Sequence, residues 1–322
     1  MGKVVDFEAA GTESQAARRS RARKRPSKSA LVLGGGGFTG GVYEIGALRA
    51  LDLLATNRTV NQFDVYVGTS AGSFIASLLA NGVTPEEMMR VLNRKLHSPL
   101  RDIDLQTLLR PNYTGFLQRS LTLPLRMVGV VRELLENVGE VSAVDIASGL
   151  ASALPAGLYS GKGIERYIAE ALADPDRTDD FRMLENELYL VGTDLDTTER
   201  IVFGEGEWAD VPISLAVAAS GALPGIYDPV DVKGREFIDG GIVSTTNVDV
   251  AVERGAKFVI VINPLVPYVN DFSKRIPTFT GSRARRVSDM GMAGILNQTF
   301  RLLSHDRLHR AVEIWEERYP GV

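Results

Sequence analysis

A G-x-S-x-G pattern occupies residues 68 to 72, where the chain reads GTSAG. Such a pattern can present a serine nucleophile when a strand precedes it and a helix follows it, and here apolar segments stand on both sides. Gly68 and Gly72 would let the strand and the helix approach a sharp turn. Ser70 would then lie at a helix N-terminus, where the helix dipole favours a developing alkoxide. We predict that Ser70 is the nucleophile of an acyl-transfer reaction.

A serine nucleophile requires a base, and the sequence offers two kinds. Asp239 follows a short apolar segment and precedes two glycines, and an aspartate in this role needs burial to raise its basicity. Among the three histidines, His97 stands beside a proline, away from any predicted strand end. His305 and His309 lie four residues apart in an amphipathic segment, and either could complete a Ser, Asp, His order. We expect both on an exposed helix face, without a third ligand for a metal.

A glycine-rich loop, GGGGFTGG, follows the apolar segment LVL. Gly35, Gly37 and Gly40 satisfy the G-x-G-x-x-G spacing of dinucleotide sites. However, the acidic residue expected about twenty positions later is missing, and so is the lysine of a P-loop. Parallel strands would bring this loop to the same sheet edge as Ser70. We therefore predict that the N–H groups of Gly35, Gly36 and Gly37 form an oxyanion hole.

The elements that must carry these residues alternate between strand and helix. Two strand–turn–helix units in series predict a parallel sheet covered by helices. Residues 84–182 are rich in helical patterns and are predicted to form a helical insertion or cap. Later segments predict a hairpin, a helix, an edge segment REFIDGG, an apolar strand and an amphipathic C-terminal helix over 283–319. In the first predicted helix, apolar residues recur at helical spacing, namely Val42, Ile45, Leu48, Leu51 and Leu54.

Composition bounds the class of protein. The 322 residues are 44% hydrophobic and 24% charged, as in ordinary globular proteins. The absence of cysteine excludes disulfides and a catalytic thiol, and fits a reducing compartment. We expect no signal peptide and no transmembrane segment, hence a cytoplasmic or peripheral-membrane protein.

The first 28 residues contain eight Lys and Arg against three Asp and Glu, within a chain of net charge −4. We interpret residues 1–28 as a disordered basic arm. This arm is either a solvated tail or a segment that is attracted to anionic lipid headgroups. Nucleic-acid binding is not expected, because the acidic body offers no basic groove to continue the arm.

In this order, GGGGFTG, GTSAG and DGG resemble the motifs of patatin-like phospholipases, which are lipid acyl hydrolases. The segments YLVGTDLDTTERIVF and AASGALPGIYDPV add to the likeness, which covers roughly residues 29–265. The resemblance implies a patatin-like catalytic domain over 29–322 with a three-layer α/β/α fold and a mostly parallel central sheet. It also implies that Ser70 is the nucleophile, Asp239 the base and Gly35 to Gly37 the oxyanion hole, with no metal or organic cofactor.

The chain departs from the family pattern at Thr39, where relatives usually carry Arg or Lys. A cation that could support a phosphate headgroup is missing, which leaves neutral acyl esters open as substrates. The implied reaction is cleavage of acyl esters of membrane lipids through an acyl-enzyme, with peripheral membrane contact. Two alternatives stay open: a small-ester carboxylesterase or thioesterase with a histidine base, and a non-catalytic lipid-binding protein with the same fold. We expect relatives to continue beyond the final YPGV, which leaves a longer parent protein open.

Overall fold

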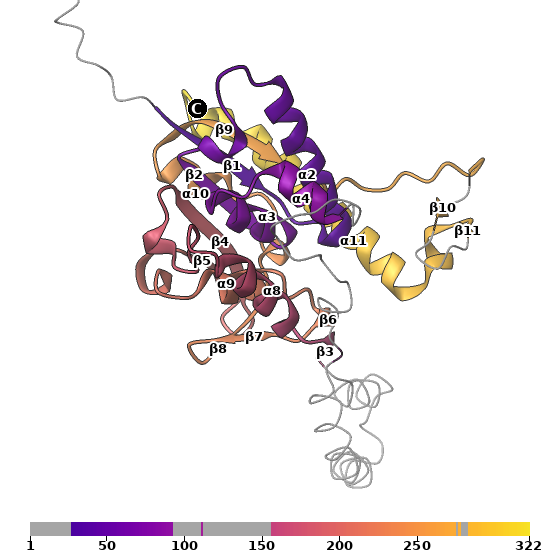
Figure 1. Cartoon of the computed structure of the whole chain (residues 1–322). Helices are drawn as coiled ribbons and strands as arrows, with labels where there is room; N and C mark the ends of the chain where they lie inside the picture. The colour runs from indigo at the N-terminus through magenta and orange to yellow at the C-terminus, as the bar shows by residue number, and fades with distance from the viewer. Residues whose placement is uncertain (1–26, 93–110, 112–155, 275, 278–282) are drawn as a thin grey trace, which may run out of the picture.

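The computed structural model describes residues 27–92, 111, 156–274, 276–277 and 283–322 (Figure 1). In these ranges a seven-stranded sheet has the order β7-β8-β4-β2-β1-β9, with β5 also paired to β4. Four strands form its parallel half: β1 (Lys28–Leu33), β2 (Val65–Thr69), β4 (Glu187–Asp194) and β9 (Ala256–Ile262). The predicted fold class, α/β with a mostly parallel central sheet between helical layers, is confirmed.

The antiparallel part of the sheet is built on β4. It comprises β5 (Arg200–Phe203), β7 (Val230–Val232) and β8 (Arg235–Asp239). The structure contains the predicted hairpin between β4 and β5. The predicted edge position of REFIDGG is wrong, because β8 pairs with both β4 and β7. A tight turn at Lys233 and Gly234, both with positive φ, returns the chain from β7, which takes the outer position.

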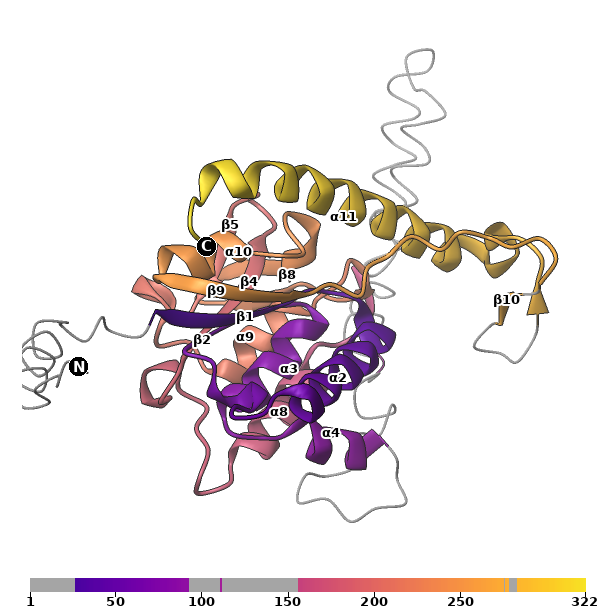
Figure 2. The ribbon, with the colours of Figure 1, turned by 90° about the horizontal axis from the view of Figure 1, so that it is seen from above.

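Alternating residues of the buried strands face two different cores. Leu31, Leu33 and Tyr66 face the larger one, whereas Ala30 and Val32 face a smaller one that is rich in valine and alanine. Helices on the first side are α2 (Gly37–Leu54), α3 (Ala71–Ala80), α4 (Pro85–Leu92), α8 (Lys162–Leu172) and α9 (Ile213–Ser220). On the second side lie α10 (Val248–Glu253) and α11 (Gly291–Arg318), and Figure 2 shows the two layers on opposite faces of the sheet.

The apolar stripe predicted for the first helix is only partly correct. Ile45 and Leu48 are buried, but Val42 is 43% exposed and Leu54 is 80% exposed. Glu44 takes a buried place on this helix, and neither of its carboxyl oxygens has a hydrogen-bond partner among the described residues. Burial raises the pKa of Glu44 well above its ordinary value.

Several sequence predictions fall outside the described residues: almost all of the basic arm, His97, and residues 93–110 and 112–155 of the predicted insertion. The C-terminal helix α11 begins at Gly291, later than predicted, because residues 287–290 form a 3₁₀ turn. The remaining short strands are β3 (Gly157–Tyr159), β6 (Gly225–Tyr227), β10 (Ile276–Pro277) and β11 (Arg283–Ala284). None of the helices in the described ranges combines the length and apolar character needed to cross a bilayer.

Candidate active site

Ser70 is the single residue that connects a strand to a helix. Strand β2 ends at Thr69 and helix α3 begins at Ala71, so Ser70 forms the whole connection between them. Its backbone has φ 56° and ψ −124°, which residues other than glycine rarely adopt. Such strain persists only where the surroundings enforce it, and it is common at functional sites.

Residues 68–72 form a sharp turn, which we call the elbow. Its two glycines are required because backbone atoms approach each other closely there. A Cβ atom on Gly72 would lie 2.4 Å from the carbonyl oxygen of Leu33, and one on Gly68 would lie 2.6 Å from Cα of Ser73. The N–H of Gly72 also donates to the carbonyl oxygen of Gly34, at 3.1 Å. The elbow therefore rests directly on the end of β1, with no room for side chains between them.

Ser70 and Asp239 are in direct contact. The hydroxyl Oγ of Ser70 donates to Oδ2 of Asp239 at 2.6 Å, and both side chains are buried. Asp239 is the last residue of β8, in register with Gly192 of β4. Its Oδ1 accepts from the N–H of Gly241 at 2.7 Å, so both carboxylate oxygens are held.

Burial changes the acid–base chemistry of Asp239. Desolvation raises its pKa to about 6, while the hydrogen bonds from Ser70 and from the N–H of Gly241 act in the opposite direction. A carboxyl with this pKa is ionised at neutral pH. It is also a stronger base than an ordinary aspartate, which suits proton transfer near neutrality.

The glycine loop links β1 to α2 beside Ser70. Gly37 is the first residue of α2 and has φ 59°. A Cβ on Gly35 would lie 3.1 Å from Cβ of Ser70, so a side chain there would crowd Ser70. Within the described part of the chain, the N–H groups of Gly35, Gly36 and Gly37 have no hydrogen-bond acceptor. The loop thus presents free donors next to Ser70.

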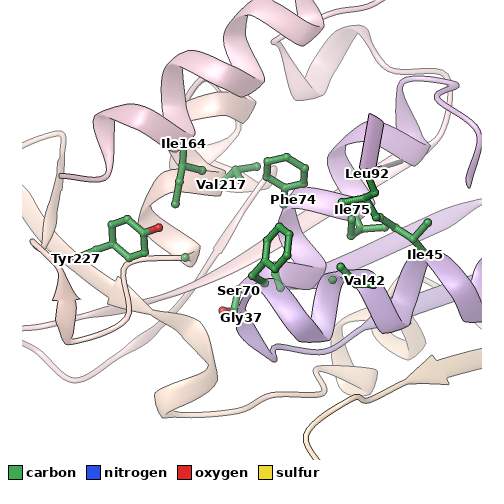
Figure 3. Close-up of a pocket in the computed structure, with 14 residues that line it drawn as sticks. Gly37, Val42, Ile45, Ser70, Phe74, Ile75, Leu92, Ile164, Val217 and Tyr227 are labelled. Atoms are coloured by element: carbon green, nitrogen blue, oxygen red, sulfur yellow. The ribbon is translucent and has the colours of Figure 1, made fainter. Parts of the chain in front are cut away.

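An apolar cavity of about 160 Å³ opens at Ser70 (Figure 3). Phe74, Ile164 and Val217 line one side, and Ile45 and Ile75 line the other. None of the described residues that line it carries a charge. Its volume is close to that of a cavity that accommodates benzene, so it would hold a segment of an apolar chain and not a whole lipid.

The two histidines of α11 lie side by side, with ring centroids 4.5 Å apart. His309 is exposed as predicted, but His305 is half-buried. Neither forms a hydrogen bond with Ser70 among the described contacts, in which the hydroxyl pairs with Asp239. In the described ranges, no group of three or more His, Asp or Glu side chains could hold a metal ion. Thr39 is exposed on the first turn of α2.

Ser220, which sequence reasoning missed, connects to both members of the pair. Its Oγ accepts from the backbone N–H of Ser70 at 2.9 Å and donates to the carbonyl oxygen of Val191 at 2.6 Å. Two residues later, the carbonyl oxygen of Ala222 accepts from the N–H of Asp239 at 3.0 Å. The end of α9 therefore fixes the backbone of both residues. The sequence signals are a small polar residue at the end of an apolar helix and its place in the segment AASGALPGIYDPV, which resembles the family.

Comparison with known proteins places this site in a family. The model of patatin-like phospholipases matches residues 31–252, which is more than half of the chain. The chain belongs to the patatin-like phospholipase family. The match begins in β1 and ends in α10, so the elbow, the glycine loop and Asp239 all lie within it.

Individual relatives are distant. The uncharacterized protein YqhO of Bacillus subtilis is 26% identical over 64% of each chain, and the uncharacterized protein R571 of a mimivirus is 25% identical over 66% of this chain and 57% of its own. The chain thus spans about 60% of the length of these relatives. Human patatin-like phospholipase domain-containing protein 6 is 28% identical over 73% of this chain and 13% of its own. The crystal structure of VipD from Legionella pneumophila aligns with a TM-score of 0.35 at 20% identity, covering 68% of this chain and 47% of VipD.

Proposed function

We propose that this protein is a serine hydrolase that cleaves acyl ester bonds of membrane lipids, with Ser70 as nucleophile and Asp239 as base. One observation carries the proposal: the Ser70 hydroxyl donates to a buried aspartate at 2.6 Å, at the mouth of an uncharged cavity. Membership of the patatin-like phospholipase family supports a lipid-hydrolysing enzyme.

In the first half of the reaction, Oγ of Ser70 attacks the ester carbonyl while its proton moves to Oδ2 of Asp239. The carbonyl oxygen becomes an oxyanion and accepts from the free N–H groups of the glycine loop. The tetrahedral intermediate then collapses. The bond to the alcohol breaks, Asp239 returns the proton to the leaving oxygen, and an acyl-enzyme remains on Ser70.

In the second half, a water molecule replaces the alcohol. Asp239 removes one proton from this water, whose oxygen attacks the acyl carbonyl, and the same N–H groups receive the negative charge. Collapse breaks the bond to Oγ and returns the proton to Ser70, which releases the fatty acid. Because Oδ1 stays bound to the N–H of Gly241, Oδ2 alone carries the proton in both halves.

The uncharged lining favours the acyl chain as the group that enters the cavity, with the alcohol side of the ester left outside. A cavity of about 160 Å³ takes only part of a long chain, so the rest of the substrate would stay at the surface. Thr39 leaves the loop without the usual cation, and we therefore include neutral acyl esters with phospholipids in the substrate class. The substrate class also implies peripheral contact with a membrane.

The test compares wild-type protein with Ser70→Ala and Asp239→Asn on short-chain p-nitrophenyl esters and on a mixed lipid extract. We expect both variants to lose at least about 10³-fold in kcat with folding intact, as removal of a nucleophile or base does in other serine hydrolases. The matched control is Asp231→Asn, which neutralises an exposed carboxylate on β7 and should leave kcat unchanged. Undiminished hydrolysis in either site variant would contradict the proposed pair.

A further inference from the structure

An arm extends from the body beyond the end of the sheet. Figure 2 shows that the chain after β9 and the first half of α11 both extend away from the strands on the same side of the body. We call residues 266–274 and 290–303 the distal arm. Gln298 joins its two halves by donating to and accepting from the backbone of Tyr268, at 2.8 and 3.1 Å. The guanidinium of Arg301 also donates a hydrogen bond to the carbonyl oxygen of Val266, at 2.9 Å.

The distal arm exposes large apolar side chains on both of its halves. Single exposed apolar residues are ordinary on a soluble protein, but a group along one projection indicates an interaction surface. Val269 is 88% exposed and Phe272 is 76% exposed. Those more than half exposed in the described arm are Val266, Val269, Phe272, Leu296, Leu302 and Leu303.

The charge of this region is opposite to that of the body. The distal arm contains Lys274 and Arg301 against Asp271, and the described residues that connect its two halves add Arg283, Arg285 and Arg286 against Asp289. Residues 29–263, in contrast, contain nineteen Lys and Arg against thirty-one Asp and Glu. Basic residues interleaved with exposed apolar ones are complementary to an anionic lipid surface, which attracts the charges and takes up the apolar side chains. We propose that the distal arm docks on an anionic lipid surface.

The roots of the distal arm lie against the two catalytic segments. Pro264, just before the arm, packs on the glycine loop, where its ring leaves no room for a side chain at Gly36. At the other root, the ring of Phe300 lies against Gly241, and Arg307 donates to the carbonyl oxygen of Val243 at 3.1 Å. An arm docked on lipid would thus hold the glycine loop and the turn after the base near the lipid surface. This use of the docking rests on the proposed function.

The experiment measures co-sedimentation of the full chain with vesicles, using Ser70→Ala protein so that hydrolysis does not alter the lipid. Vesicles of phosphatidylcholine alone are compared with vesicles containing one-third phosphatidylserine. We expect binding to the anionic vesicles, and a loss of about tenfold or more with Val269→Asp plus Phe272→Asp. The matched control is Leu53→Asp plus Leu54→Asp, two residues of α2 that are 71% and 80% exposed. This control should leave vesicle binding unchanged.

A second pair of variants tests the charge. Lys274→Glu plus Arg285→Glu should lower binding to anionic vesicles about tenfold, because each basic residue near the surface contributes about fivefold or less. Lys257→Glu plus Arg58→Glu makes the same charge change near the amino-terminal ends of β9 and β2. These ends lie opposite the ends from which the distal arm extends, so this pair should lower vesicle binding less. Circular dichroism verifies that all variants are folded.

Absence of binding to anionic vesicles would overturn the docking, and so would equal losses in the arm variants and their controls. Equal binding to neutral and anionic vesicles would also overturn it. Hydrolysis of a dispersed short-chain ester by wild-type protein is measured separately. Vesicle binding without any hydrolysis would contradict the proposed enzyme alone, and hydrolysis without vesicle binding would contradict the docking alone.

Discussion

Replacing Asp239 by asparagine should remove activity and stabilise the fold. In the folded protein burial raises the pKa of Asp239 from an ordinary value of 3.8 to about 6. At neutral pH its ionised form therefore lowers the stability of the folded state. Each pKa unit corresponds to about 1.4 kcal/mol, so the destabilisation is about 3 kcal/mol above pH 7. Asparagine is neutral and can keep both contacts: its amide oxygen accepts from Gly241, and its amide nitrogen donates to Oγ of Ser70.

The sign of the effect follows from proton linkage. The folded state binds the proton of Asp239 more tightly than the unfolded state does. The contribution of Asp239 to the free energy of unfolding is therefore largest below about pH 4 and is lost as pH rises through 6. The asparagine variant has no such loss. The difference in unfolding free energy between Asp239→Asn and wild type should therefore be smallest near pH 4 and increase to about 3 kcal/mol at pH 7.5.

Urea unfolding at pH 4, 5.5 and 7.5, followed by circular dichroism, measures this difference. Asp231→Asn, at an exposed carboxylate, serves as the control and should not gain stability over wild type at pH 7.5. The reasoning is refuted if Asp239→Asn is less stable than wild type at pH 7.5, or if the difference is the same at pH 4 and pH 7.5. Hydrolysis by the same samples shows whether stability and activity change in opposite directions.

Three further variants and one pH profile test the site. Ser220→Ala removes the acceptor of the nucleophile's backbone N–H, so kcat should fall about tenfold or more with little change in KM, as steady-state kinetics will show. Gly36→Ala places a Cβ about 2.8 Å from the Pro264 ring and should lower both the unfolding temperature and the rate of hydrolysis; a variant with wild-type kinetics would contradict the proposed oxyanion loop. His305→Ala combined with His309→Ala should keep most of the activity, whereas its loss would favour a histidine base. Finally, kcat/KM should rise about tenfold per pH unit below pH 6 and level off above, following ionisation of the base; a flat profile from pH 5 to 8 would argue against it.

Much of the fold and of the candidate site could be predicted from sequence because the constraints are local. Backbone atoms approach each other closely at Gly68 and Gly72, and the presence of glycine at both positions indicates this approach from the sequence alone. The strand–turn–helix repeats predict the parallel half of the sheet, since such units leave few other arrangements. The contact between Ser70 and Asp239 was suggested by family resemblance and not by spacing. Their catalytic roles stay predictions until the variants are assayed.

The remainder depends on contacts between distant parts of the chain. Ser220 accepts a hydrogen bond from a residue 150 positions earlier, and the resemblance of its segment to the family does not indicate this contact. Helical periodicity placed Val42 in the core and gave no sign that Glu44 is buried there instead. The outer position of β7 was missed because strands of three residues give almost no periodic signal. Packing between elements, and not local pattern, decides each of these.

The separation of Ser70 and Asp239 has a consequence for biosynthesis. The two residues are 169 positions apart and are brought together by pairing of β2 with β4 and of β4 with β8. Closing such long loops is slow relative to helix formation, so the pair assembles late in folding. The proposed active site of a growing chain is therefore incomplete until β8 has left the ribosome and joined the sheet. In refolding experiments, ester hydrolysis should therefore return after the helical circular dichroism signal, because the proposed pair forms only when the sheet is complete.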